Sequence, residues 1–199
     1  METFFQEVKE KIIEAVTNQF PKMREEFEDE KPYAVAFETD SDCITLWLGV
    51  NTHEFLKKKD AKYGNEGYDP NTKWNPSEWG YSDGDSQLAR LSDELYENKS
   101  SIYDQISKQN PNQTPDETYE QFVALIEESR LTELFFETVT AAFQELIEAN
   151  VFGFNHDEVT YFITMSDDNR AEEIENNSAK KLNSKKIYEE FLNRYKGVN

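Results

Sequence analysis

The fold is decided by residues 33–50, which read YAVAFETDSDCITLWLGV. Two short apolar runs, 33–37 and 43–50, lie on either side of the polar residues 39–42. Asp and Ser side chains bind nearby backbone groups in turns, so residues 39–42 favour a reversal of the chain. The pattern predicts two buried strands joined as an antiparallel hairpin.

A third strand and several helices are predicted outside the hairpin. Residues 159–165, VTYFITM, are mostly β-branched or aromatic, which is typical of a strand. Apolar residues recur every four positions from Phe4 to Phe20, which predicts an amphipathic helix that ends near Pro21. Helical spacing also predicts helices over 88–96, 115–126, 131–147 and 187–195, with a short helix within 170–182.

Residues 114–117, TPDE, give the clearest local signal for the start of a helix. Thr114 suits the N-cap, Pro115 suits the first helical position, and Glu117 completes a capping box. No strand–helix–strand unit repeats, so we do not expect a doubly wound parallel sheet. We expect a single α+β domain over residues 1–199, with several helices covering a small, mostly antiparallel sheet made of the hairpin 33–50 and strand 159–165.

Two polar stretches are expected to lie at the surface. Residues 24–30, REEFEDE, are too acidic to bury and should be solvated. Residues 60–85 are rich in Gly, Asn, Asp, Pro and Tyr, which predicts a long loop. Long loops within compact domains are usually functional.

The chain is strongly acidic, with 41 Asp and Glu against 21 Lys and Arg and a formal net charge of −20. That balance excludes binding to a nucleic acid or an anionic membrane through net charge. Residues 114–175 hold 16 of the acidic residues and 2 basic ones. They form either a solubilising surface or a surface for a basic partner. On the outward faces of the two predicted helices, we expect Glu127, Glu137, Glu145 and Glu148 to contact such a partner.

Residues 74–81, WNPSEWGY, place two tryptophans around a proline. An indole ring packs well on a proline ring, and its N–H needs an acceptor. In one interpretation the motif closes one end of the sheet and orders the long loop. In the other it is an aromatic platform, since Trp and Tyr dominate interface hot spots. The partner contacts would then be Trp74, Glu78, Trp79 and Tyr81.

The sequence contains no recognisable catalytic or cofactor motif. Cys43 is the only cysteine, so it cannot form an internal disulfide, and we expect a small buried side chain. His53 and His156 are far apart and lack zinc-ligand spacing. Dinucleotide-binding, Walker and nucleophile-elbow motifs are absent. We therefore expect no enzyme activity, no cofactor and no metal.

The location expected for this protein is the cytoplasm. No apolar run approaches the ~18 residues that a membrane helix needs. The first residues do not resemble a secretory signal. We expect no membrane or nucleic-acid partner, and the oligomeric state stays open.

Several of these segments together resemble an uncharacterised bacterial family called domain of unknown function 4303. The resemblance is carried by residues 33–40, 51–52, 74–81, 142–153, 159–168 and 178–183. The chain departs from the family pattern at Asn183-Ser184, where Asn-Pro is expected. Serine lacks the preset helix start of proline, and Asn183 can still cap the following helix.

The resemblance implies no activity, but it implies a context. Such small acidic proteins are similar to immunity proteins of bacterial polymorphic-toxin systems, which bind and block a cognate toxin. We therefore expect a non-enzymatic protein-binding module, an immunity protein against a basic toxin domain. The alternative is a small-ligand-binding protein or enzyme with its site under the 60–85 loop, lined by Trp74, Glu78, Trp79 and Asp167. A third option is an acidic scaffold protein that self-associates.

Overall fold

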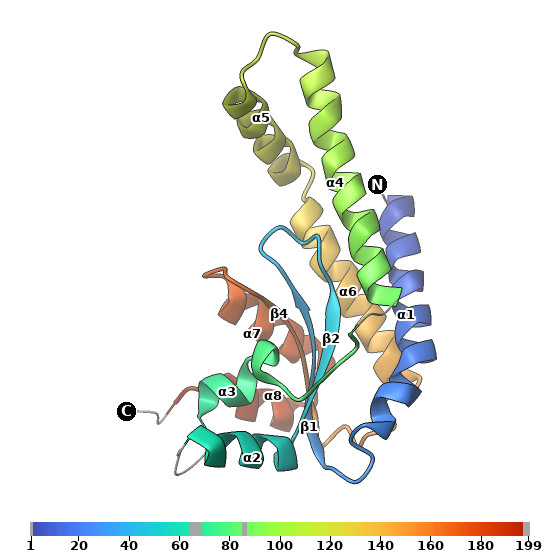
Figure 1. Cartoon of the computed structure of the whole chain (residues 1–199), viewed down its shortest axis with the longest axis vertical. Coiled ribbons are helices and arrows are strands. Elements are labelled where there is room, and N and C mark those ends of the chain that lie inside the picture. Colours follow the sequence, from blue (N-terminus) through green and yellow to red (C-terminus); the bar gives the residue numbers. More distant parts are fainter. Residues whose placement is uncertain (1, 64–68, 85–86, 197–199) are drawn as a thin grey trace.

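A four-stranded mixed sheet forms the centre of the molecule (Figure 1). The computed structural model describes residues 2–63, 69–84 and 87–196. The sheet has the order β3-β2-β1-β4. The strands are β1 (Pro32–Thr39), β2 (Trp47–Thr52), β3 (Tyr81–Ser82) and β4 (Thr160–Met165).

Strand β1 pairs with β2 antiparallel and with β4 parallel, while β2 pairs with β3 antiparallel. The predicted α+β fold with a mostly antiparallel sheet is therefore confirmed, with one parallel pair that makes the sheet mixed. The long chain between β2 and β4 supplies the crossover that a parallel neighbour requires.

Helices cover both faces of the sheet. Side chains of β1 alternate between the faces, as the two-residue period of a strand dictates. Val35 and Phe37 join the larger core with α1 (Glu2–Glu25), α4 (Gln87–Gln109) and α6 (Leu131–Glu148). Ala34 and Ala36 face a smaller core. Its helices are α2 (His53–Tyr63), α3 (Pro70–Trp74), α7 (Ala171–Leu182) and α8 (Lys185–Leu192).

The hairpin is confirmed, but the predicted start of its second strand at Cys43 is wrong. Strand β2 begins at Trp47, and Cys43 lies in a turn with φ 55°. The Asp40 carboxylate accepts hydrogen bonds from the N–H groups of Asp42, at 2.9 Å, and Ile44, at 3.1 Å. These bonds extend the turn into the apolar run. Burial nevertheless raises the pKa of the half-buried Cys43 thiol to about 12.

The segment expected to be one long loop, 60–85, contains regular structure. It holds the end of α2, helix α3, the 3₁₀ turn η1 (Pro76–Glu78) and strand β3. The Asn75 side chain accepts a hydrogen bond from Ser77 N–H at 3.2 Å and caps η1. Residues 64–68 lie outside the described residues, as does the pair 85–86.

The acidic stretch 24–30 is also less solvated than predicted. Phe27 is buried, and its ring packs against Tyr81 at 4.8 Å between centroids. The side chain of Glu30 is only 15% exposed. An aromatic anchor within the acidic run thus holds the run against the sheet.

Helices α4 and α5 (Pro115–Glu128) form an arm that projects from the sheet (Figure 1). Helix α4 continues well beyond the predicted end near residue 96. The predicted capping box at Thr114 and Glu117 is confirmed. Thr118 is the one buried residue on α5 among those described. We call α4 and α5 together the arm.

The predicted short helix within 170–182 is confirmed as α7, but the predicted capping role of Asn183 is wrong. Asn183 is the C-cap residue of α7, and its side chain turns back to strand β4. Ser184 occupies the N-cap of α8 and makes no capping hydrogen bond with its side chain.

Candidate functional site

The aromatic motif of residues 74–81 packs mainly inside the molecule. Trp74 is 8% exposed and lies edge-on to Phe191, with ring centroids 5.1 Å apart. Trp79 is half-buried, and its indole N–H donates to the Lys73 carbonyl at 3.1 Å. For Trp74, the structure agrees with the interpretation in which the motif closes one end of the sheet. Little of the Trp74 ring is left for a partner.

The other two predicted contacts of the motif have partners within the chain. Glu78 is exposed and forms an ion pair with Lys59 at 2.5 Å. The Tyr81 hydroxyl donates to Glu30 Oε2 at 2.8 Å. Burial, together with that hydrogen bond, raises the pKa of Tyr81 to about 12. Tyr81 is therefore a neutral hydrogen-bond donor at physiological pH.

The four predicted outward glutamates are all exposed, and the structure places them on α5 and α6. Glu145 pairs with Lys9 at 2.5 Å, and Glu137 pairs with Arg130 at 3.5 Å. Within the described ranges, Glu127 and Glu148 have no ion-pair partner. Exposed ion pairs contribute little to stability, so Glu137 and Glu145 can exchange their partners at small cost.

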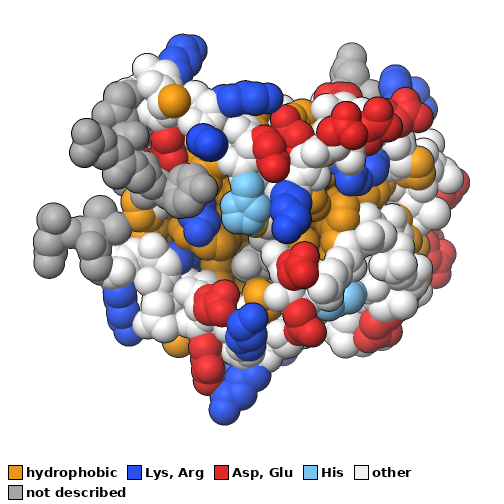
Figure 2. All heavy atoms as spheres, turned by 90° about the horizontal axis from the view of Figure 1, so that it is seen from below, with side chains coloured by type: hydrophobic (Ala, Val, Ile, Leu, Met, Phe, Trp, Pro, Cys, Tyr) orange, Lys and Arg blue, Asp and Glu red, His pale blue; other side chains and the backbone are white. Residues whose placement is uncertain are grey.

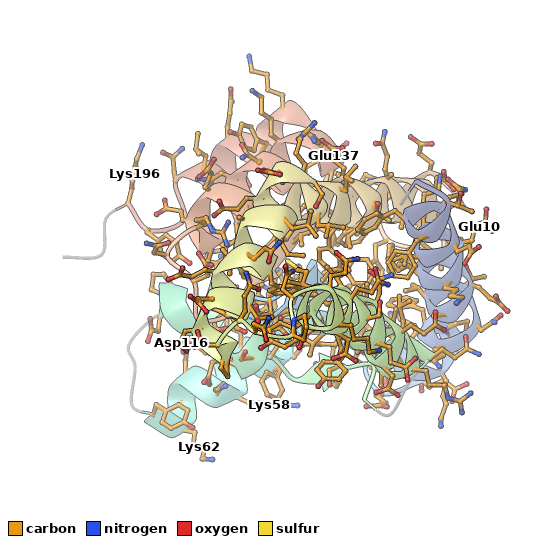
Figure 3. The ribbon with its side chains drawn as sticks, turned by 90° about the horizontal axis from the view of Figure 1, so that it is seen from above. Glu10, Lys58, Lys62, Asp116, Glu137 and Lys196 are labelled. Atoms are coloured by element: carbon orange, nitrogen blue, oxygen red, sulfur yellow. The ribbon has the colours of Figure 1, made fainter. Side chains whose placement is uncertain are left out.

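Helix α5 extends this acidic surface onto the arm. Between Pro115 and Glu128 it carries five carboxylates and no basic residue. Figure 3 shows the labelled Asp116 on α5 and Glu137 on α6, with Glu10 on the other side of the view. Large apolar side chains are exposed beside the carboxylates: Tyr96 and Tyr119 are each 58% exposed, and Leu125 is 41% exposed. The arm thus combines charge with apolar anchors.

A second feature is a cleft of about 440 Å³ beyond the C-terminal ends of the parallel strands β1 and β4. Strand β1 contributes Glu38, and the turn after β4 contributes Asp167 and Asp168. Helix α7 contributes Glu175, while Ser77 comes from η1. The parallel pairing places both strand ends at one edge of the sheet, so residues distant in sequence meet there. We call this the carboxylate cleft.

Glu38 lies at the base of the carboxylate cleft and is only 4% exposed. Its Oε1 accepts a hydrogen bond from the Ser77 hydroxyl at 2.9 Å. Its Oε2 is buried and has no hydrogen-bond partner among the residues that the structure describes. Burial raises the pKa of Glu38, and the neighbouring carboxylates of Glu175 and Asp167 raise it further.

Two other carboxylates of the cleft already have cationic partners. Arg194 donates from Nη2 to Glu175 Oε2 at 2.5 Å, and both side chains are buried. The Thr164 hydroxyl donates to the other oxygen of Glu175 at 2.6 Å. Hydrogen bonds from the Arg170 side chain and backbone lower the pKa of Asp168 to about 2. Glu38 and Asp167 therefore carry the unpaired charge in the described part of the cleft.

The small-ligand site predicted from the sequence comprised Trp74, Glu78, Trp79 and Asp167; Glu78 and Trp79 do not line the cleft, and Glu38 and Glu175 were missed. Trp74 and Asp167 do line the carboxylate cleft. Glu38 had a usable signal, because a carboxylate follows the apolar run 33–37 directly. Glu175 had none, since its place depends on how α7 packs against β4.

A third feature is a hollow of about 520 Å³ on the lower face, near α2 and α8. Figure 2 shows hydrophobic atoms in the hollow, with basic, acidic and histidine side chains around it. Its lining includes Lys31, His53 and Lys73 but also Asp157 and Glu190. Burial and the Lys73 charge lower the pKa of His53. The mixed charges do not select a ligand of one sign.

Residues 2–63, 69–84 and 87–196 contain neither a metal-binding cluster nor a helix of membrane-spanning character. In these ranges, no group of three or more His, Cys, Asp or Glu side chains is placed to hold a metal ion. None of the helices there is long and apolar enough to span a membrane.

Comparison with known proteins gives one match. A family model described as a domain of unknown function, DUF4303, matches residues 12–184. No curated protein and no solved structure matches the chain.

Proposed function

We infer the function of this chain, which belongs to the family described as a domain of unknown function (DUF4303), from its surface, because that description assigns no activity. We propose that the protein is a non-enzymatic binding module that docks on a basic protein through the acidic arm. In the specific form of this proposal it is a bacterial immunity protein that acts in the cytoplasm and blocks a basic toxin domain.

The observation that carries the proposal is the charge of α5. Five carboxylates and no basic residue occupy a helix that projects from the sheet and buries one of its described residues. Such a concentrated field attracts a basic surface and can raise association rates by about 10–10³-fold. The exposed rings of Tyr96 and Tyr119 offer the apolar contacts that dominate binding energy once the surfaces meet.

The predicted contact residues fit this surface unequally. Glu127, the one predicted contact on the arm, has no ion-pair partner in the described chain, so a partner's Lys or Arg can bind it without competition. Glu148 also has no ion-pair partner there, but it lies at the C-terminal end of α6, outside the arm. Glu137, Glu145 and Glu78 form ion pairs with basic residues of the same chain, which would have to break before a partner binds. These pairs lie at the surface and are weak. Trp79 and Tyr81 are half-buried; Trp79 follows η1 and Tyr81 begins β3, so neither belongs to the arm.

The mechanism that we propose is occlusion. A toxin that acts on nucleic acid holds phosphates with Lys and Arg side chains. Carboxylates of the arm would occupy those side chains and cover the surface on which the substrate binds. No bond is made or broken by this protein.

Co-expression tests the proposal. Any basic toxin domain that a neighbouring gene encodes is expressed with the wild-type chain or with one of two triple variants that change charge equally. The arm variant carries Glu120→Gln, Glu127→Gln and Glu128→Gln. The α1 control variant carries Glu7→Gln, Glu10→Gln and Glu14→Gln on the exposed side of α1.

We expect the wild type and the α1 control variant to restore growth, and the arm variant to restore it poorly. If neither the wild type nor any variant protects cells from a neighbouring toxin, the immunity proposal is wrong. If the arm variant protects as well as the wild type, the assignment to the arm is wrong.

A further inference from the structure

We propose that the carboxylate cleft binds an organic cation, an ammonium or guanidinium group carried by a small molecule. This inference is independent of the proposed docking of the arm, because the cleft lies at the sheet and involves none of the residues of α4 or α5. The cleft has a volume of about 440 Å³. That volume is within the range of small-ligand sites.

The charges of the cleft determine whether it attracts a cationic or an anionic ligand. Of the carboxylates that line it, Glu175 is matched by Arg194 and Asp168 by Arg170. Glu38 and Asp167 have no ion-pair partner in the described residues, so the cleft keeps an excess of negative charge. An anionic ligand would be repelled, and a cationic one attracted.

The buried oxygen of Glu38 is the second observation that points to a ligand. A polar atom removed from water normally has a hydrogen-bond partner, because an unmade bond costs free energy. Glu38 Oε1 has Ser77, but Oε2 has no partner in the described chain. A cation in the cleft would compensate this carboxylate through its charge and its N–H donors.

The protein's own Arg194 shows how this region accommodates a guanidinium group. Its Nη2 binds Glu175, and its Nη1 binds Asn176 Oδ1 at 2.7 Å. Its guanidinium carbon lies 4.0 Å from the ring centroid of Phe191 and 4.7 Å from that of Tyr195. Carboxylate together with aromatic faces is the usual environment of a bound organic cation. The cleft presents carboxylates together with one accessible ring, that of Tyr195, which is 41% exposed and lies in its wall.

Binding should depend on pH in a direction that the cleft dictates. The ionisable groups that line the cleft with Glu38 are Asp167 and Asp168 from the turn after β4, Glu175 from α7 and Tyr195 after α8. Arg170 pairs with Asp168, and Arg194 pairs with Glu175. The segment from Trp74 to Ser77 contributes none. Because burial raises the pKa of Glu38, its carboxylate takes up a proton at a higher pH than a free glutamate does, and affinity for a cation should fall as the pH is lowered through that pKa.

Calorimetric titration of the full chain tests the proposal with argininamide and lysinamide as cationic probes. Citrullinamide is the control for the guanidinium group, since it has the same length, and all three compounds are Nα-acetylated so that citrullinamide is neutral. We expect at least one cationic probe to bind about tenfold more tightly than citrullinamide, a difference of one order of magnitude in the dissociation constant.

Two variants locate the binding. Glu38→Gln keeps the shape of the side chain and should raise the dissociation constant of the cationic probe about tenfold. Glu14→Gln removes one exposed charge from α1, outside the cleft, and should leave affinity within about twofold. If Glu38→Gln does not fold, Asp167→Asn at the exposed rim takes its place, with a loss of about threefold or more.

Three results would overturn the proposal. The first is that neither cationic probe binds the folded wild type. The second is that argininamide and citrullinamide bind equally. The third is that Glu38→Gln and Glu14→Gln behave alike, since the probe would then be responding only to net charge. None of these results bears on docking by the arm, which is tested with a protein partner.

Discussion

The side chain of Asn183 pairs with the backbone of Tyr161 as a neighbouring strand would. Its Oδ1 accepts from Tyr161 N–H at 2.8 Å, and its Nδ2 donates to the Tyr161 carbonyl at 2.6 Å. Two residues along β4, Ser178 Oγ accepts from Ile163 N–H at 2.9 Å. Because β4 is an edge strand, these side chains from α7 and its C-cap cover backbone groups that would otherwise be open to another chain.

Replacing Asn183 should therefore weaken the fold markedly. Asn183→Ala leaves the Tyr161 N–H and carbonyl without these partners, and we expect the free energy of unfolding to drop by about 2–3 kcal/mol. Urea denaturation measures the change. Asn177→Ala is the control, because Asn177 is exposed on the same helix, and its effect should stay within about 0.5 kcal/mol. Equal effects of the two variants would show that the pairing with β4 contributes nothing.

The neighbouring Ser184 offers the opposite kind of change. The φ of Ser184 is −61°, which suits proline, and the preceding Asn183 is extended, with φ −122° and ψ 162°. The Ser184 side chain makes no capping hydrogen bond. Ser184→Pro should raise the free energy of unfolding by about 0.4–1 kcal/mol, because the unfolded chain loses freedom. Thermal and urea denaturation measure the gain. Destabilisation would mean that the Ser184 N–H or hydroxyl has a role in the folded state.

Glu38 should make stability fall as the pH rises. Its ordinary pKa is 4.5, and burial raises the value in the folded protein. The folded state therefore binds more protons than the unfolded state between the two pKa values, so the free energy of unfolding declines through that range.

Glu38→Gln removes this contribution and should flatten the decline above pH 4.5, as measured by urea denaturation at a series of pH values. Glu175, whose pKa is also raised by burial, remains in both proteins, so the difference between them isolates Glu38. If the free energy of unfolding changes with pH in the same way for the wild type and the variant, the decline does not come from Glu38.

The hydrogen bond between Tyr81 and Glu30 should give the free energy of unfolding the opposite dependence on pH. Burial opposes ionisation of Glu30, but hydrogen bonds from Thr52, Tyr81 and Lys58 together lower its pKa below 4.5. The resulting stabilisation is present above the unfolded pKa and is lost as the pH falls through the folded value.

Tyr81→Phe removes one of these hydrogen bonds and should cost about 1–2 kcal/mol near neutral pH. The cost should shrink in acid, where Glu30 is protonated in both states. Tyr119→Phe is the control, since Tyr119 is 58% exposed on the arm and should show no change at either pH. If Tyr81→Phe lowers the free energy of unfolding by the same amount in acid and at neutral pH, the contribution of the Tyr81 hydroxyl does not depend on the charge of Glu30.

Local patterns predicted the main elements, because their causes are local. The apolar runs around 39–42 predicted the hairpin, and the signature at Thr114 and Glu117 predicted the start of α5. The bounds of β2 were missed because one side chain, Asp40, holds the following apolar residues in the turn. The far half of α4 was missed because it packs along α5, so it lacks the full apolar stripe of a core helix.

The site was predictable only in part. The acidic character of α5 and α6 follows directly from the positions of their glutamates, and those glutamates are exposed. The alternatives for Trp74 required a tertiary structure, since burial depends on Phe162 and Phe191 from other elements. The carboxylate cleft exists because β4 lies parallel to β1, a pairing between strands distant in sequence that no local pattern reports.

Docking by the acidic arm is tested most directly by the dissociation constant of the complex with any basic toxin domain that a neighbouring gene encodes, measured at about 50 mM and about 300 mM salt. We predict that the wild type and the α1 control variant bind alike, that the arm variant binds about tenfold more weakly at low salt, and that high salt reduces this difference. Equal affinities for the arm and α1 control variants, or an affinity of the wild type that salt does not change, would contradict the proposal.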